Sequence, residues 1–228
     1  MKRIILAGGA GFLGSALSKH FNARGWLVVV LTRSPKPRPD GVKEIAWDSR
    51  TAGDWTREVD GADAVINLTG RSVDCRYNEK NRRVIIASRV DSTRVVGEAI
   101  ARAAKPPRAW LNSSSATLYL HTFDTPMDEN GPTGATPAAK DEFSIEVIRR
   151  WERACDEAQT PRTPRSRCAP RWFWAITRTA SFPSCGGLHS LALAGEWAAG
   201  GNSFPGFTRR ISAVRSNGSL NMRRFPAR

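Results

Sequence analysis

The sequence has little of what disulfide frameworks, metal centres or membrane spans require. It contains four cysteines in 228 residues, with no Cys-x-x-Cys pair and no metal-ligand spacing, so we expect reduced thiols and no metal site. No apolar run approaches the roughly 18 residues that cross a bilayer. The N-terminal apolar stretch runs straight into glycines and is too short for a signal peptide. Together these absences predict a cytoplasmic protein that does not enter a membrane.

Acidic residues and lysines are scarce in the last third of the chain. After Glu157 there are eleven arginines, no lysine and a single acid, Glu196, whereas the residues before this point are nearly balanced in charge. The whole chain has a formal net charge of +14. A basic excess is typical of nucleic-acid or anionic-membrane binding. These arginines are scattered among Pro, Gly and Trp without groove-like or helical spacing, which disfavours both partners.

The first thirty residues have the pattern of a dinucleotide-binding βαβ unit. An apolar strand at 3–7 leads into a glycine-rich turn, a helical pattern over 15–21 and a second apolar strand at 26–31. Glycines permit a tight turn and a close approach to a pyrophosphate, which the helix N-terminus then stabilises. The predicted cofactor contacts in this turn are Gly8, Gly11, Phe12, Leu13 and Gly14. Phe12 and Leu13 are also expected on the apolar face of the helix.

The end of the second strand indicates which dinucleotide is bound. An acid there would accept a hydrogen bond from a ribose 2′-hydroxyl, but the sequence has Thr32 and Arg33, with Lys36 and Arg38 nearby. Because a guanidinium can pair with a 2′-phosphate, NADP is favoured, with NAD as the alternative. An ordinary solvated arginine is the other interpretation of Arg33. Asp48, after the next strand, is predicted to lie near the adenine.

Further alternation of strands and helices predicts a parallel sheet. An apolar strand begins at residue 64, a long amphipathic helix lies within 78–104, and another strand covers 109–115. The fold class is therefore α/β, a Rossmann-type doubly wound parallel sheet whose ligands gather at the carboxyl ends of the strands. The turn that ends the first of these strands supplies four further predicted cofactor contacts, Asn67, Leu68, Thr69 and Gly70.

Five separated motifs carry a resemblance to a known family. The glycine turn 8–14, the segment 67–70 and the Ser-Ser-Ser-Ala-Thr-Leu-Tyr run 113–119 resemble the extended short-chain dehydrogenase/reductases, in nucleotide-sugar-epimerase style. The Ser-Arg-Val-Asp-Ser-Thr-Arg run 88–94 and Arg-Trp-Glu at 150–152 resemble its atypical subfamily. That subfamily is often labelled NAD-dependent epimerase/dehydratase or cell-division-inhibitor-like. The resemblance implies NAD(P) and a small-molecule substrate, sugar-like or carbonyl.

The resemblance also implies catalytic residues. Ser115 matches the family's catalytic serine, which hydrogen-bonds the reacting oxygen of the substrate. The usual base is a tyrosine followed four residues later by a lysine that lowers the pKa of the phenol. Here the comparable helix has Phe143 and Val147, so that dyad is absent. Tyr119 could act as a substitute acid, or could equally be a packing residue.

The last third of the chain resembles a sequence translated in the wrong frame. Shifted codons across 201–213 can encode Gln-Phe-Ile-Ser-Trp-Ile-His-Glu-Ala-Asp-Phe-Cys, which resembles the subfamily's Ser-Trp-Ile-His-x-x-Asp motif. The same operation across 165–176 can encode a sixth strand that the chain as translated lacks. We therefore expect a frameshift close to Thr163. A Rossmann domain over 1–163 would then precede an aberrant, poorly ordered basic tail over 164–228.

Three functions remain open from the sequence. The first is an NADP-binding epimerase or reductase, impaired because its C-terminal half is lost. The second is a non-catalytic nucleotide-binding or regulatory protein, consistent with the missing tyrosine–lysine dyad. The third is a nucleic-acid-binding protein that uses the basic tail, which the scattered arginines disfavour. The oligomeric state is open.

Overall fold

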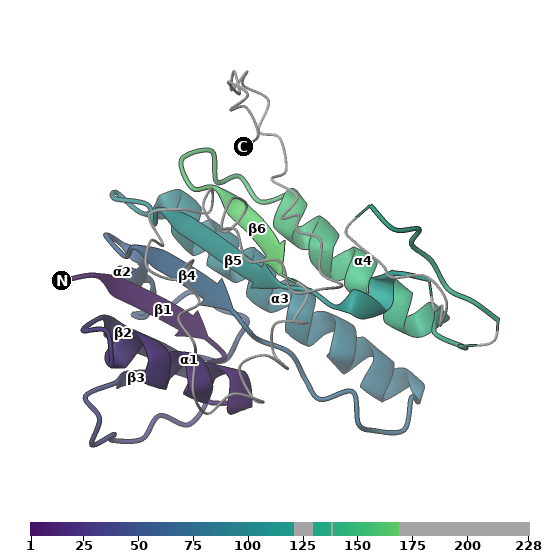
Figure 1. Cartoon of the computed structure of the whole chain (residues 1–228), viewed down its shortest axis with the longest axis horizontal. Helices are drawn as coiled ribbons and strands as arrows, with labels where there is room; N and C mark the ends of the chain where they lie inside the picture. Colours follow the sequence, from purple (N-terminus) through teal and green to yellow (C-terminus); the bar gives the residue numbers. More distant parts are fainter. Residues whose placement is uncertain (121–129, 138, 169–228) are drawn as a thin grey trace, which may run out of the picture.

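Six parallel strands form a single sheet in the computed structural model, which describes residues 1–120, 130–137 and 139–168 (Figure 1). Their order across the sheet is β3-β2-β1-β4-β5-β6. The strands are β1 (Arg3–Ala7), β2 (Leu27–Thr32), β3 (Lys43–Ala46), β4 (Ala64–Asn67), β5 (Ala109–Ser113) and β6 (Arg165–Cys168). The chain moves outward from β1 first to one side and then to the other, which is the doubly wound Rossmann arrangement predicted from the sequence.

Helices cover both faces of this sheet. They are α1 (Phe12–Asn22), α2 (Thr56–Val59), α3 (Glu79–Arg102) and α4 (Glu142–Asp156), with a short 3₁₀ turn η1 (Ala116–Leu118) after β5. The long helices α3 and α4 lie side by side, and α3 projects beyond the sheet (Figure 1). Within the described part of the chain, no helix combines the length and the apolar character that a membrane crossing needs.

The period-two alternation of the strands divides the core into two layers. Ile5 pairs with Val29 on one side and Val65 on the other, and their side chains pack in one cluster with α3 and α4. The alternate residues of the same strands face α1, where Leu17 and Phe21 cover them. Strands buried on both faces are apolar along their whole length, as in other all-parallel sheets.

The sixth strand extends the sheet beyond the boundary expected at residue 163. The sequence argument expected this strand to be missing, but Arg165–Cys168 pairs with β5 in parallel register. Backbone pairing depends little on side-chain identity, and the side chains here also find partners: Arg167 forms ion pairs with Glu152 and Asp156 of α4. The rest of the tail, residues 169–228, lies outside the described residues.

Phe12 differs from its sequence expectation. It was predicted to share the buried face of its helix, but it is 64% exposed in the first turn of α1. Leu17 and Phe21, farther along the helix, do reach the core. Phe12 is the first residue of α1, next to the exposed N-cap Gly11, whereas Gly14 of the same turn is buried.

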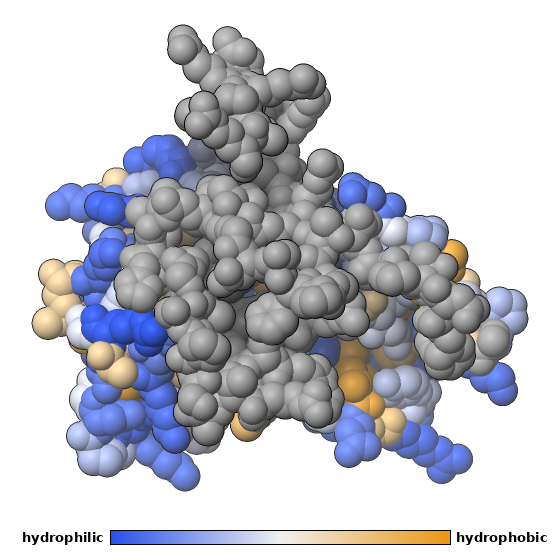
Figure 2. Space-filling model, viewed as in Figure 1, coloured by the Kyte–Doolittle hydropathy of each residue, from blue (hydrophilic) through white to orange (hydrophobic). Residues whose placement is uncertain are grey.

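The described surface is largely hydrophilic on the side seen in Figure 2, with small apolar patches. Three cysteines fall in the described part of the chain, and Cys75, Cys155 and Cys168 are all free thiols. Burial raises the pKa of both Cys155 and Cys168 to about 12, so neither forms a reactive thiolate near neutral pH. No cluster of three or more His, Cys, Asp or Glu side chains suited to a metal ion occurs among residues 1–120, 130–137 and 139–168.

Candidate functional site

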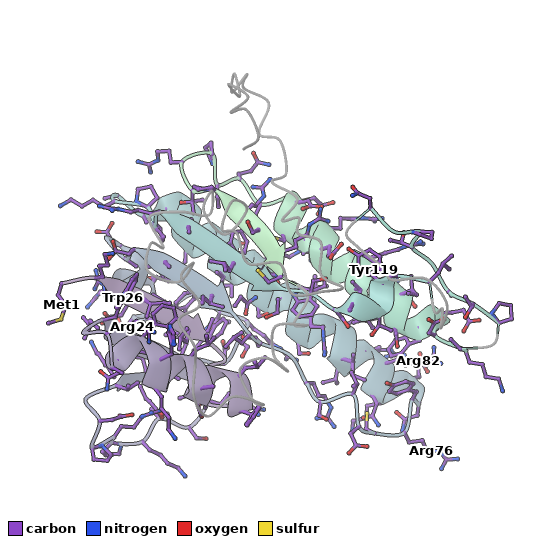
Figure 3. All side chains as sticks on the ribbon, viewed as in Figure 1. Met1, Arg24, Trp26, Arg76, Arg82 and Tyr119 are labelled. Carbon is purple, nitrogen blue, oxygen red and sulfur yellow. The ribbon has the colours of Figure 1, made fainter. Side chains whose placement is uncertain are left out.

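The predicted site segments meet at the carboxyl edge of the sheet. The glycine turn follows β1, Thr32 ends β2, Asn67 ends β4, and the serine run follows β5. Because all these strands are parallel, their carboxyl ends lie at one edge. Figure 3 shows the two ends of the sheet: Tyr119 lies toward the carboxyl edge, whereas Met1 and Trp26 lie at the opposite end.

Three of the four glycines in the segment 8–14 have three different surroundings. Gly14 packs on the preceding turn so closely that a Cβ there would lie 2.0 Å from the carbonyl oxygen of Gly9. Gly8 has φ +71°, and a Cβ on it would lie 2.7 Å from the hydroxyl of Thr69. By contrast, a Cβ on Gly11 would have no heavy atom of the described residues within 4 Å. The turn is therefore closely packed at both ends and open in its middle.

The open middle of this turn coincides with the N-terminus of α1. Gly11 is the N-cap residue, and no side chain caps the helix there. The N–H groups of a first helical turn carry partial positive charge and bind anions. Leu13, partly exposed, and Phe12 flank this position. A glycine without close neighbours beside an uncapped helix end fits a bound pyrophosphate.

At the end of β2, Thr32 and two arginines of the following loop have different contacts. Arg38 is committed to Asp40 and Glu44, and its hydrogen bond to Asp40 is the main reason its pKa is raised. Arg33 is exposed, and no described residue pairs with its guanidinium. Thr32 holds the neighbouring strand through its carbonyl oxygen, which accepts a hydrogen bond from the Trp47 N–H at 2.8 Å. Among the described residues, Arg33 and Lys36 are thus the cations of this loop whose side chains have no ion-pair partner, and Arg33 lies directly after β2.

Asp48 organises the loop after β3. One carboxylate oxygen accepts hydrogen bonds from the backbone N–H groups of Arg50 and Thr51, at 2.8 and 2.9 Å, and the other accepts from the Thr51 hydroxyl. The hydrogen bond from the Thr51 N–H contributes most to lowering the pKa of Asp48. This carboxylate is therefore used mainly to shape the loop, which gives Asp48 an indirect part in any adenine contact.

A buried polar network supports the turn after β4. Asn67 is fully buried and donates from Nδ2 to Asn112 Oδ1 at 2.8 Å and to Thr93 Oγ1 at 3.2 Å. Its Oδ1 accepts from the Thr69 N–H at 3.1 Å, while the Leu68 N–H donates to the Ala7 carbonyl. The Thr69 hydroxyl is buried against the Gly8 turn and has no hydrogen-bond partner in the described part of the chain. Asn67 thus fixes the turn after β4. The Thr69 hydroxyl lies between this turn and the turn after β1, without a partner among the described residues.

The Ser-Arg run on α3 holds the outer end of the same turn. The Ser88 hydroxyl accepts from the Arg71 N–H at 3.0 Å. Arg89 donates from Nη1 to the Arg71 carbonyl at 3.1 Å and lies against Gly70, where a Cβ would be 3.1 Å from the guanidinium carbon. In the sequence these residues only supported the resemblance. Their contact with Gly70 joins residues distant in sequence, which no local pattern predicts.

Ser115 lies in the first turn after β5. Its hydroxyl is 3.0 Å from that of Thr117 and accepts from the Thr117 N–H at 3.3 Å, so it caps η1. Tyr119 follows η1 and bridges to Thr133 through the backbone. Both side chains are only partly buried. Ser115 is therefore held by its own turn, at the edge where the other segments converge.

The neighbouring serine is held by α4. Ser114 is buried, and its hydroxyl donates to Glu152 at 2.5 Å. Glu152 also accepts from Arg167 of β6 at 3.0 Å. This chain of contacts ties the segment after β5 to α4 and β6, and sequence reasoning missed it because it depends on the sixth strand.

Phe143 and Val147 lie where the tyrosine–lysine dyad was sought. Both are buried in a small cluster with Ile85 of α3. The rings of Tyr77 and Phe143 are 5.1 Å apart, and the Arg82 guanidinium lies 4.5 Å from the Phe143 centroid. These two positions therefore contribute packing between α3 and α4 and carry no group that could transfer a proton.

Comparison with known proteins identifies the family. Residues 4–144 match the NAD dependent epimerase/dehydratase family. The chain belongs to this family. It is 31% identical over 155 residues to human epimerase family protein SDR39U1, an alignment that covers 67% of this chain and 48% of that protein. The chain thus spans about half the length of this relative.

Solved structures agree with the fold. The human SDR39U1 (isoform 2) structure with NADPH aligns with a TM-score of 0.60 and 28% identity, covering 73% of this chain and 52% of the other. MoeE5 in complex with UDP-glucuronic acid and NAD aligns with a TM-score of 0.59 and 19% identity, over 73% and 53% of the two chains. At that lower identity the second likeness establishes the fold alone.

Proposed function

We propose that this chain binds NADPH, in preference to NADH, across the carboxyl ends of β1, β2 and β4. The observation that carries the proposal is the turn after β1, where Gly8 and Gly14 are closely packed and Gly11 faces open space at an uncapped helix end. The human relative whose structure contains NADPH supports it. In this arrangement α1 would stabilise the pyrophosphate and Arg33 the 2′-phosphate.

The other predicted contacts have distinct parts in this proposal. Thr69 offers a buried hydroxyl between the two glycine-containing loops, and Leu68 and Gly70 shape the turn over which a cofactor would pass. Asn67 and Asp48 act indirectly, because their side chains accept hydrogen bonds that fix the backbone of their loops. Phe12 and Leu13 flank the anion position at the start of α1.

For the reaction, we propose epimerase- or reductase-type chemistry on a carbonyl or sugar-like substrate. Ser115 would donate a hydrogen bond to the reacting oxygen, and Tyr119 would be the candidate acid. Hydride exchange is the chemistry that the nicotinamide supplies when bound. The activity would be impaired if the C-terminal half, which completes the substrate site, is out of frame.

A second candidate is a dinucleotide-binding protein without catalysis. The burial of Phe143 and Val147 against Ile85 favours it, because the usual proton-transfer pair is replaced by packing residues. NADPH consumption in the presence of carbonyl compounds and nucleotide sugars separates the two candidates. Binding without turnover would favour the second.

Cofactor preference is tested by titrating NADPH and NADH into the wild-type chain and the Arg33→Asp variant. A charge-assisted pair with the 2′-phosphate contributes roughly 1.5–3 kcal/mol, so wild type should favour NADPH by about tenfold or more. Arg33→Asp should remove this preference. Lys36→Asp, an equal charge reversal in the same loop, should retain most of it. Equal wild-type affinities for both cofactors would contradict the assignment.

A further inference from the structure

Arg89 carries a partly buried positive charge that no carboxylate of the described residues balances. Burial lowers the pKa of its guanidinium, and the only ionisable group that opposes this effect is the Tyr77 phenol. Among the described residues, no Asp or Glu forms an ion pair with it, whereas Arg50, Arg150 and Arg167 each have one. A guanidinium stays charged at physiological pH, and burying it without a counter-charge is costly.

The hydrogen bonds of Arg89 use only one side of its guanidinium. Nη1 donates to the carbonyl oxygens of Arg71 and Ile85, both at 3.1 Å. A Cβ on Gly70 would lie 3.1 Å from the guanidinium carbon, 3.2 Å from Nη2 and 3.4 Å from Nε, and the Trp151 ring lies 5.3 Å from that carbon. No described residue accepts a hydrogen bond from Nε or Nη2. These two N–H groups form the edge that binds carboxylates and phosphates in a bidentate manner.

The position of Arg89 separates it from the proposed pyrophosphate site. The glycine turn contacts Thr69, and the next residue, Gly70, contacts Arg89. On its other side Arg89 contacts Trp151, which precedes Glu152, the partner of Ser114. Arg89 therefore lies between the cofactor turn and the serine run. A pyrophosphate already has the N-terminus of α1, so Arg89 offers a second anion position on the substrate side.

We propose that Arg89 binds a carboxylate or phosphate group of the substrate through Nε and Nη2. The proposal rests on the NADPH-binding function above, because it assigns the pyrophosphate to α1. It predicts that the substrate is anionic, and that its charged group lies beside the turn after β4 while its reacting oxygen faces Ser115.

Inorganic phosphate is the probe for this site. Its binding to the NADPH-loaded chain is measured by ³¹P NMR titration, for wild type and for Arg89→Gln. Loss of a charge-assisted bidentate contact should weaken phosphate binding by about tenfold. Arg82→Gln is the matched control, since Arg82 is also an arginine of α3 that stacks on an aromatic ring and donates to a backbone carbonyl. Figure 3 shows it toward the end of α3 that projects beyond the sheet.

The outcomes distinguish this proposal from the proposed function. The control should change phosphate affinity less than twofold; equal losses in Arg82→Gln and Arg89→Gln would mean general charge attraction and would overturn the proposal. If NADPH loading abolishes phosphate binding, the anion at Arg89 belongs to the cofactor, and the substrate assignment is wrong. If NADPH itself does not bind wild type, the proposed function fails, and phosphate titration of the unloaded chain still measures Arg89.

A charge-conserving variant distinguishes loss of the phosphate contact from loss of the folded structure. Arg89→Lys keeps the positive charge but replaces the planar fork by a single ammonium. It should retain a cooperative thermal transition and bind phosphate more weakly than wild type but more tightly than Arg89→Gln. Wild-type phosphate affinity in a folded Arg89→Lys chain would overturn the bidentate contact.

Discussion

Ser115 shows how one hydroxyl can have a structural and a chemical part at the level of a single residue. It caps η1 by accepting from the Thr117 N–H, and in the proposed reaction it would donate to the substrate. A hydroxyl can do both, because it accepts through lone pairs and donates through its proton. Loss of the hydroxyl therefore affects both local stability and turnover, and the two effects must be measured separately.

Ser115→Ala should abolish any reductase or epimerase turnover while cofactor affinity changes little. The lost cap should cost about 1 kcal/mol of unfolding free energy at most. Thr117→Val is the control, because it removes the other hydroxyl of the pair and keeps the backbone N–H. Tyr119→Phe retains the ring and tests whether its hydroxyl acts as an acid. If both Ser115→Ala and Tyr119→Phe turn over at the wild-type rate, neither residue takes part in chemistry.

At the level of elements, two glycines of the turn between β1 and α1 have different parts. Gly14 packs against the turn, and Gly11 is proposed to lie against the cofactor. Gly14→Ala should destabilise the fold by about 2 kcal/mol or more, because its Cβ would overlap the Gly9 carbonyl and push α1 off the sheet. Gly11→Ala should leave thermal stability nearly unchanged, since its Cβ meets nothing, yet should weaken NADPH binding by occupying the ligand's space. Thermal unfolding and NADPH titration of both variants check this pair. Wild-type NADPH affinity in Gly11→Ala would argue against a cofactor at this turn.

The strands and helices that position the site were largely predictable from the sequence. Apolar runs at β1, β2 and β4 and the glycine turn are local signals, and each element appeared within a few residues of its expected place. The contacts between elements were not predictable, because they join residues that no periodicity relates. Asn67 reaches Thr93 and Asn112, and Arg89 reaches Gly70, only after the sheet and α3 have packed.

The sequence did not predict the sixth strand, for a different reason. Arg165–Cys168 lacks the apolar pattern of a buried strand, so local sequence gives little reason to expect it. Its position is explained by pairing with β5 and by the ion pairs of Arg167 with α4, both of which are tertiary features.

At the scale of the whole molecule, we predict that restoring the reading frame near Thr163 raises the cooperativity of unfolding, the solubility and the affinity for NADPH. The restored segment can encode an apolar sixth strand and a segment that resembles the subfamily's Ser-Trp-Ile-His-x-x-Asp motif, which would bury more apolar surface. Thermal unfolding should become more cooperative, solubility should rise, and NADPH binding should strengthen. Resequencing the gene around codon 163 is the direct check on the frameshift itself.

Measurements on the chain as it stands can contradict this prediction. Hydrogen exchange and limited proteolysis of the present chain would do so by revealing a protected core within residues 169–228. Binding of an oligonucleotide that weakens steeply with salt would instead support the basic tail as a nucleic-acid-binding segment.

The strand order has a consequence for how the chain folds during synthesis. β1 can pair with β2 soon after both leave the ribosome, but its other neighbour, β4, emerges only later, and β5 and β6 then add outward one at a time. Before β4 is made, β1 is an unpaired edge of the growing sheet, and β4 and β5 then become this edge in turn. Such an edge can pair with other chains until the next strand covers it. β5 ends at Ser113 and β6 begins only at Arg165, so β5, with its fully buried Trp110, remains an unpaired edge while the residues between them are made.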